Sequence, residues 1–199
     1  MIIWLNGAFG SGKTQTANEL VRRCDRLFLY DPEMIGYFLR DHLPSERMPA
    51  DFQDIPMWRS FNFEMLRFMA GSYEADIVVP MTITNRQYFD EIILRLREDS
   101  IDVRHFILSC TEAALYKRLR SRCDGKDSWA AHQIVRCVNA FENDITERKI
   151  ETDCLSISEV AETVAAECGL ELTKGRLNSI QGFLFRQKIK LKNTKWFPF

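Results

Sequence analysis

Short runs of apolar residues alternate along this chain with longer stretches whose apolar positions repeat at helical spacing. Strands are predicted over residues 2–6, 27–30, 77–81, 103–108 and 150–155, and the first three of these are almost wholly apolar. Runs undiluted by polar residues are typical of strands buried on both faces of a sheet. The stretches between them predict helices over residues 14–23, 57–71, 88–98, 111–122, 128–145 and 158–168. Strands that alternate with such helices indicate right-handed βαβ units, so we expect an α/β fold in three layers around a parallel five-stranded sheet.

The first apolar run leads directly into a glycine-rich segment. Residues 7–14 read Gly-Ala-Phe-Gly-Ser-Gly-Lys-Thr, the complete G-x-x-x-x-G-K-[ST] phosphate-binding pattern. Its glycines let the backbone turn tightly, so that successive N–H groups point at phosphate oxygens. Lys13 then reaches the β- and γ-phosphates, and the Thr14 hydroxyl is placed to ligate Mg²⁺. The segment predicts a P-loop site for ATP made by Gly7, Ala8, Phe9, Gly10, Ser11, Gly12, Lys13, Thr14 and Gln15.

Asp31 follows the second apolar run, in the segment Tyr30-Asp31-Pro32-Glu33. In a parallel sheet, the end of a strand beside the first one opens into the same crevice as the phosphate loop. A carboxylate there can accept a proton from a substrate hydroxyl or hold magnesium. Asp31 is equally suited to cap a helix that begins at Pro32, and the two roles are compatible. Because no Asp follows the run 77–81, we expect Thr14 and Asp31 to serve the metal.

Two arginines provide further candidates for catalysis. Arg118 and Arg122 are four residues apart, so they share a helical face just before the polar segment 123–128. Arginines on a mobile lid can stabilise the charge that phosphoryl transfer spreads over the phosphate oxygens. A solvated basic face is the alternative, but the neighbouring phosphate loop favours the catalytic role.

The predicted helix 57–71 is rich in large apolar side chains. It is either a buried helix that packs on the sheet or one wall of a wide acceptor pocket, where an aromatic face would suit a sugar or a nucleobase. Residues just after the third strand would face the same cavity. The candidates for substrate binding are Trp58, Arg59, Asn62, Thr82 and Arg86.

Length and composition fit a globular domain that needs no disulfide or metal to fold. The chain has 199 residues, six scattered cysteines without a C-x-x-C pair, and no apolar run near the roughly 20 residues that span a bilayer. The phosphate loop interrupts the N-terminus, so the sequence does not predict a signal peptide there. We therefore expect a cytoplasmic protein with reduced thiols.

The charge is unevenly distributed. Residues 173–199 contain seven basic residues and no acidic one, which leaves 20 basic against 28 acidic residues in 1–172. We therefore expect a P-loop kinase-like domain at 1–172 and a basic, aromatic C-terminal tail at 173–199. The tail either lies peripherally on an anionic membrane at the inner surface or docks on the acidic body. Nucleic acid is not expected as a partner, because the domain has no matching basic signature.

Several of these segments together resemble the tunicamycin resistance protein family of bacterial phosphate-loop proteins. The more specific segments are Trp58-Arg59-Ser60-Phe61-Asn62 and Ser128-Trp129-Ala130-Ala131. The full set of matching segments is 2–17, 30–33, 51–53, 58–62, 77–83, 118–122, 125–131 and 152–157.

The resemblance implies an ATP-dependent protein that confers resistance to tunicamycin, a lipid-tailed nucleoside antibiotic. It also implies a fold similar to chloramphenicol phosphotransferase, shikimate kinase and gluconate kinase. In those enzymes an acidic residue after the second strand handles the acceptor hydroxyl, and Asp31 matches it. Arginines of the lid in those enzymes bind ATP, and Arg122 matches them best. The missing Asp after the third strand departs from the stricter magnesium pattern.

The leading hypothesis is phosphoryl transfer from ATP–Mg²⁺ to a hydroxyl of tunicamycin or a related nucleoside. One alternative is a binding protein that sequesters the drug at the membrane and uses ATP only to set its conformation. Another is a kinase for a different small metabolite.

Overall fold

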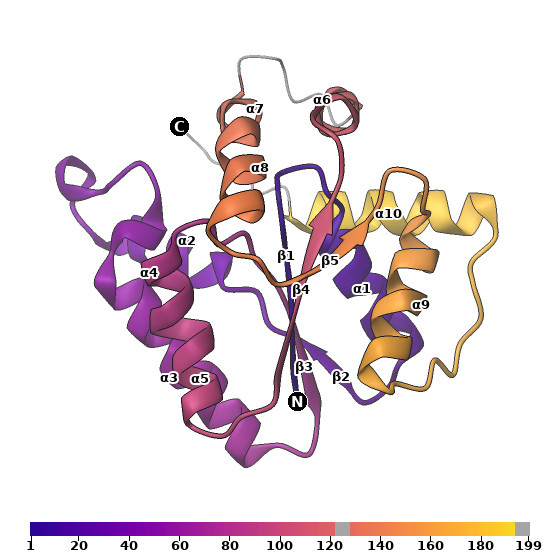
Figure 1. Cartoon of the computed structure of the whole chain (residues 1–199), viewed down its shortest axis with the longest axis horizontal. Coiled ribbons are helices and arrows are strands. Elements are labelled where there is room, and N and C mark those ends of the chain that lie inside the picture. Colours follow the sequence, from indigo (N-terminus) through magenta and orange to yellow (C-terminus); the bar gives the residue numbers. More distant parts are fainter. Residues whose placement is uncertain (122–127, 194–199) are drawn as a thin grey trace.

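Five parallel strands form the central sheet of the computed structural model, which describes residues 1–121 and 128–193 (Figure 1). The order across the sheet is β2-β3-β1-β4-β5, so β1 lies in the middle. The strands are β1 (Ile2–Gly7), β2 (Leu27–Leu29), β3 (Asp76–Pro80), β4 (Val103–Ser109) and β5 (Arg148–Glu151). The predicted parallel five-stranded sheet is confirmed, although β5 begins and ends earlier than the predicted strand 150–155.

Helices cover both faces of this sheet, which confirms the three-layer α/β architecture. One face packs against α1 (Lys13–Arg23) and α9 (Ile157–Cys168). The other face packs against a larger set of helices, which is the left-hand layer in Figure 1 together with α6. This set is α2 (Glu33–His42), α3 (Pro56–Ser72), α4 (Arg86–Phe89), the π-helical turn η3 (Asp90–Leu94), α5 (Arg95–Glu98), α6 (Glu112–Arg120), α7 (Trp129–His132) and α8 (Ile134–Asn143).

Alternation along β1 explains why both faces are buried. Ile2 and Trp4 belong to the core beneath α3, whereas Ile3 and Leu5 belong to the core beneath α1 and α9. Since successive side chains of a strand point to opposite faces, an uninterrupted apolar run contributes side chains to the hydrophobic cores on both faces of the sheet.

Several helix boundaries follow from local chemistry. Pro56 occupies the first turn of α3, where its missing N–H costs nothing. Ser156 and Glu159 form a capping box at the start of α9, and Gly169 ends that helix in the left-handed conformation with φ 66°.

The structure differs from the sequence prediction in three helical regions. Helix α2 follows Pro32, where the sequence indicated a helix start but no extent. The predicted helix 88–98 begins earlier and is divided by the π-helical turn η3, and the predicted helix 128–145 is divided at Gln133. Short 3₁₀ turns occupy Ser45–Arg47 and Phe52–Asp54.

The C-terminal extension carries a helix, α10 (Ser179–Asn193), which lies against α1 (Figure 1). Basic and apolar residues alternate over 188–192, as they would in a strand, yet this stretch is helical. Ile189 is buried against the body, whereas Ile180, Phe183, Leu184 and Leu191 are all more than half exposed. Their spacing puts these four side chains on one face of the helix, pointing away from the protein.

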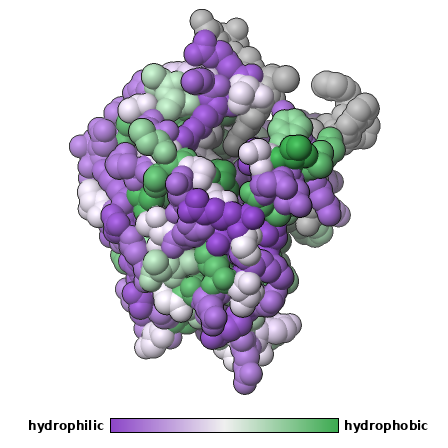
Figure 2. Space-filling view, turned by 90° about the vertical axis from the view of Figure 1, so that its right-hand side faces the viewer, coloured by the Kyte–Doolittle hydropathy of each residue, from purple (hydrophilic) through white to green (hydrophobic). Residues whose placement is uncertain are grey.

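Within the described residues, no helix is both long enough and apolar enough to cross a membrane. On the side of the molecule that carries α9 and α10, hydrophobic surface lies in patches among mostly hydrophilic residues (Figure 2).

Replacing Gly7 by Ala tests the backbone at the end of β1. Gly7 has φ 143°, and a Cβ there would lie 2.7 Å from the Leu108 carbonyl oxygen. We expect Gly7→Ala to lower the free energy of unfolding by roughly 2 kcal/mol or more, because both the left-handed backbone and the contact are unfavourable. Gly71→Ala is the matched control, since a Cβ in this exposed last part of α3 meets nothing within 4 Å. It should be neutral or slightly stabilising in urea unfolding. Equal effects of the two substitutions would contradict the expectation.

Candidate active site

The phosphate loop joins the end of β1 to the start of α1. Gly10 and Gly12 have φ values of 91° and 105°, a conformation that side chains other than glycine rarely adopt. The backbone N–H groups of Gly10, Gly12, Thr14 and Gln15 find no acceptor among the described residues. A run of N–H groups without acceptors at a helix N-terminus is a binding site for an anion such as a phosphate.

Lys13 lies along this loop. Its Nζ donates to the carbonyl oxygens of Gly7 and Ala8, at 2.8 and 3.1 Å. The ammonium group also lies 5.5 Å from the centre of the Phe9 ring, and Trp129 contacts that ring edge-on at 5.0 Å. The cation is therefore held at the loop, beside the N–H groups that lack acceptors.

Buried polar residues at the end of β1 and after β3 hold the phosphate loop in place. Asn6 is fully buried and its Oδ1 accepts from the N–H groups of Gly7 and Ile83, at 2.8 and 3.0 Å. Its Nδ2 donates to the Ile83 carbonyl at 2.8 Å and lies 3.2 Å from Nε2 of His105. Thr82, a substrate-binding candidate, instead donates its hydroxyl to the Gly7 carbonyl at 2.9 Å. Thr82 thus joins the segment after β3 to the phosphate loop.

Asp31 lies at the end of β2 and at the start of α2. Its Oδ1 accepts from the N–H of Glu33 at 3.0 Å, which is the capping role that the sequence left open. Burial and the Asp31 charge raise the pKa of Glu33, while Lys13 acts in the opposite direction. The Tyr37 hydroxyl donates to Glu33 at 3.3 Å, and burial raises the pKa of Tyr37 to about 12. The sequence analysis missed Glu33, although its position two residues after Asp31 placed it in the same helical start.

Arg118 contacts the phosphate loop and the end of β5. Its Nη2 donates to the Thr152 carbonyl at 2.6 Å, and its Nη1 donates to the Thr152 hydroxyl at 3.1 Å. The same Nη1 lies 3.5 Å from the Ser11 carbonyl oxygen. The guanidinium group therefore lies beside the phosphate loop. Arg122, the second arginine of the pair, falls outside the described residues.

Three of the substrate-binding candidates are buried in the packing of α3. The Trp58 indole donates to the Pro32 carbonyl at 3.0 Å, and Asn62 accepts from the Tyr30 hydroxyl at 2.7 Å. Arg59 pairs with Glu91 at 2.5 Å and donates to the Gln53 carbonyl at 2.6 Å. These contacts agree with the packing alternative for this helix.

Arg86 is exposed at the start of α4, where it forms an ion pair with Asp90 at 2.9 Å. Of the candidates for catalysis and substrate binding, the structure therefore brings Lys13, Thr82 and Arg118 to the phosphate loop. Glu33, which interacts with Asp31, lies within electrostatic reach of Lys13.

The residues present fit a magnesium ion bound together with phosphate oxygens. Thr14 and Asp31 offer a hydroxyl and a carboxylate, which are the hard oxygen ligands that Mg²⁺ prefers. No group of three His, Cys, Asp or Glu in the described ranges is arranged to hold a metal alone. The ion would therefore depend on the nucleotide for most of its ligands.

The fold and the loop define the class: this is a P-loop nucleotide-binding protein of kinase-like architecture. Residues 2–142 match the sequence family described as the AAA domain. A search among curated proteins finds no match.

Solved structures extend the comparison. The tunicamycin resistance protein of Deinococcus radiodurans is 30% identical, with a TM-score of 0.75 over 87% of this chain and 98% of that one. A gluconokinase from Sinorhizobium meliloti is 17% identical, with a TM-score of 0.60 over 93% and 95%. The APS kinase of Mycobacterium tuberculosis, solved with AMPPNP and APS, is 17% identical, with a TM-score of 0.57 over 84% and 96%. The last two likenesses concern the fold alone.

The chain belongs to the AAA-domain family of P-loop proteins and, within it, to the tunicamycin resistance protein family. The resemblance drawn from the sequence segments is thereby confirmed.

Lowering the pH tests the buried cluster behind the loop. Burial lowers the pKa of His105 to about 3, from an ordinary value near 6.5. Between pH 7 and 5 the unfolded chain therefore binds a proton at His105 that the folded protein does not. We expect this residue alone to lower the free energy of unfolding by about 2 kcal/mol over that range.

Urea unfolding at both pH values measures this contribution. His105→Gln should lose less stability than the wild type as the pH falls, by about that amount. His42→Gln, at an exposed position, should behave as the wild type does. An unchanged pH dependence in His105→Gln would show that the histidine is not held neutral.

Proposed function

We propose that this protein transfers the γ-phosphoryl group of ATP to a hydroxyl of a small molecule, and that the acceptor is tunicamycin or a related nucleoside. The observation that carries the proposal is the phosphate loop, whose N–H groups at Gly10, Gly12, Thr14 and Gln15 lack acceptors in the described part of the chain. Asp31 supplies the second requirement of a kinase, a carboxylate that can receive the hydroxyl proton. It follows β2, which is not the neighbour of β1 that the sequence suggested, since β3 lies between them.

In the proposed reaction, the loop N–H groups and Lys13 bind the β- and γ-phosphates and neutralise their charge. The acceptor oxygen forms a bond to the γ-phosphorus while the bond from that phosphorus to the bridging oxygen of ADP breaks. Asp31 takes the hydroxyl proton, and ADP leaves with the electron pair. Thr14 and Asp31 would hold a magnesium ion, whose charge would screen the phosphates. Arg118, which already contacts the Ser11 carbonyl, and Arg122 are the proposed cations for the developing charge.

The side chains of α3 support the acceptor side by holding α2 in place. Trp58 donates to the Pro32 carbonyl, next to Asp31, and Asn62 holds Tyr30 on the other side of Asp31. We propose that Trp58, Arg59 and Asn62 shape the acceptor pocket through this packing, and that Thr82 and Arg86 border it. Tunicamycin is proposed as the acceptor because of the family and because of the name of the Deinococcus radiodurans protein.

A pair of substitutions tests the assigned roles. Lys13→Ala should weaken ATP binding by roughly a hundredfold, because a charge-assisted contact to phosphate is lost. Asp31→Asn should bind ATP as the wild type does but lose transfer, because the amide accepts no proton. Calorimetry with ATP and mass spectrometry of tunicamycin after incubation with ATP supply the two measurements.

The outcomes separate the hypotheses. A drug heavier by one phosphoryl group supports the kinase, and tight drug binding without product supports ATP-dependent sequestration. Phosphorylation of another hydroxylated metabolite, with none of the drug, would point to a different acceptor. Retained turnover in Asp31→Asn would reduce this residue to a helix cap.

We further propose that the protein is cytoplasmic and lies peripherally on the inner membrane through α10. The exposed face of this helix carries Ile180, Phe183, Leu184 and Leu191. Lys188 and Lys190 flank that face in the helical arrangement. An apolar stripe between cations is the pattern of a helix that lies in an anionic membrane surface. Ile189, on the opposite side of α10, is buried against the body, so the proposed membrane contact would not require α10 to leave the body.

Vesicles test this placement directly. The double substitution Phe183→Ser, Leu184→Ser should lower binding to phosphatidylserine-containing vesicles by roughly tenfold or more, since two apolar side chains no longer enter the bilayer surface. Met65→Ser, Phe68→Ser removes two exposed apolar residues of α3 and serves as the control. Sedimentation of protein with vesicles measures both. Equal binding of the two variants to the vesicles would show that α10 is not the membrane contact.

A further inference from the structure

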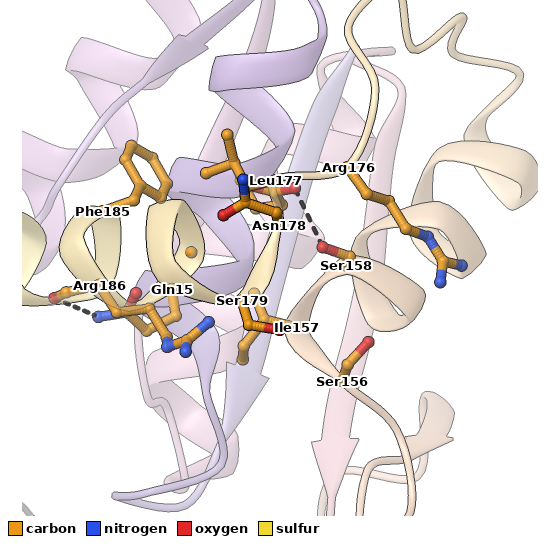
Figure 3. A pocket seen from close by; sticks show the side chains of 12 residues that line it. Gln15, Ser156, Ile157, Ser158, Arg176, Leu177, Asn178, Ser179, Phe185 and Arg186 are labelled. Atoms are coloured by element: carbon orange, nitrogen blue, oxygen red, sulfur yellow. Dashed lines mark hydrogen bonds between the residues drawn. The ribbon is translucent and has the colours of Figure 1, made fainter.

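A pocket of about 330 Å³ lies between the protein body and the C-terminal extension (Figure 3). The body contributes Gln15 from α1 and the residues that open α9, including Ile157. The extension contributes Asn178, Ser179 and Arg186. The pocket therefore exists only because α10 lies across the start of α1.

The pocket adjoins the phosphate loop on two sides. Gln15 directly follows Thr14, and its own N–H is one of those that lack an acceptor. Ile157 approaches the loop so closely that its Cδ1 would lie 3.1 Å from a Cβ on Gly12. Phosphates bound on the loop thus lie next to this pocket, and the rest of the same ligand has room there.

Arg186 gives the pocket a cation that is not matched by a protein carboxylate. Its guanidinium group folds back over Gly182, within 3.1 Å of where a Cβ would be. No ion pair of Arg186 occurs among the described residues. By contrast, Arg176 at the same pocket pairs with Glu162, and Glu19 pairs with Arg22.

Gln15 is also incompletely hydrogen-bonded within the described residues. Its Nε2 donates to the Arg186 carbonyl at 3.5 Å, the outer limit of a hydrogen bond, as drawn in Figure 3. Its Oε1 is covered and has no donor within the residues described. A turn of this amide would let Oε1 accept from a hydroxyl, while a planar guanidinium stacks well on an aromatic base.

We propose that this pocket receives the ribose and base of the nucleotide whose phosphates lie on residues 7–14, so that the extension forms one wall of the nucleotide site with Arg186 facing the nucleoside. The inference rests on the proposed nucleotide binding and assigns the nucleoside half of the ligand. It gives the extension a role in ligand binding besides membrane contact.

Comparing ATP with inorganic tripolyphosphate tests the assignment, because the two share the phosphates and differ in the nucleoside. Arg186→Ala should raise the Kd for ATP by roughly tenfold and leave the Kd for tripolyphosphate unchanged. Lys188→Ala removes the same charge from an exposed site of α10 outside the pocket, and it should change neither value. Calorimetry on the full-length protein measures all of these.

A second substitution keeps the test independent of charge. Ser179→Trp places a large side chain at the mouth of the pocket, and it too should weaken ATP selectively. Circular dichroism confirms that each variant folds.

Each other outcome contradicts the inference. Unchanged ATP affinity in both Arg186→Ala and Ser179→Trp would show that the pocket is packing space only. Equal weakening of ATP and tripolyphosphate would show that Arg186 acts on the phosphates. Wild-type protein that binds neither compound would overturn the proposed function itself, whereas the first two outcomes leave it intact.

Discussion

Backbone amide groups of the loop after β1 that find no acceptor in the described part of the chain are the constraint on which this structure depends. Leaving a backbone polar group without a partner is costly unless water or a ligand supplies one. The loop after β1 keeps this conformation because it is held on several sides. Asn6 binds it from the sheet, Thr82 from the end of β3 and Arg118 from the end of β5. Much of the polar interior thus serves to keep one short turn in a single shape.

The acceptor side is built around the start of α2. Asp31 is bonded to the backbone of Glu33, and the packing of α3 fixes the residues on either side of it. Burial and the neighbouring charge of Asp31 raise the pKa of Glu33, and the charge of Lys13 partly offsets this. The ammonium group therefore binds at the loop and also favours the charged form of a carboxylate in α2.

The sequence predicts well what depends on neighbouring residues. The phosphate loop is a continuous segment, and the strands β1 and β3 lie in apolar runs, so both can be recognised without knowing their contacts. The roles of Arg59 and Arg118 could not be predicted in this way. Arg59 pairs with Glu91 and Arg118 bonds to Thr152, partners more than thirty residues away that only the folded chain brings close. Helix α10 was hard to predict for a related reason. Its basic residues alternate with apolar ones as in a strand, whereas its packing on α1 favours a helix.

The position of Gln15 has a consequence for how the two ends of the chain behave together. This residue belongs to the first turn of α1, beside the phosphate loop, and its amide touches the backbone of α10. Any ligand on the loop that alters the docking of α10 must, by thermodynamic reciprocity, be held more or less tightly when that helix is engaged elsewhere. If α10 engages a lipid surface as proposed, that surface and a nucleotide would be effectors of each other.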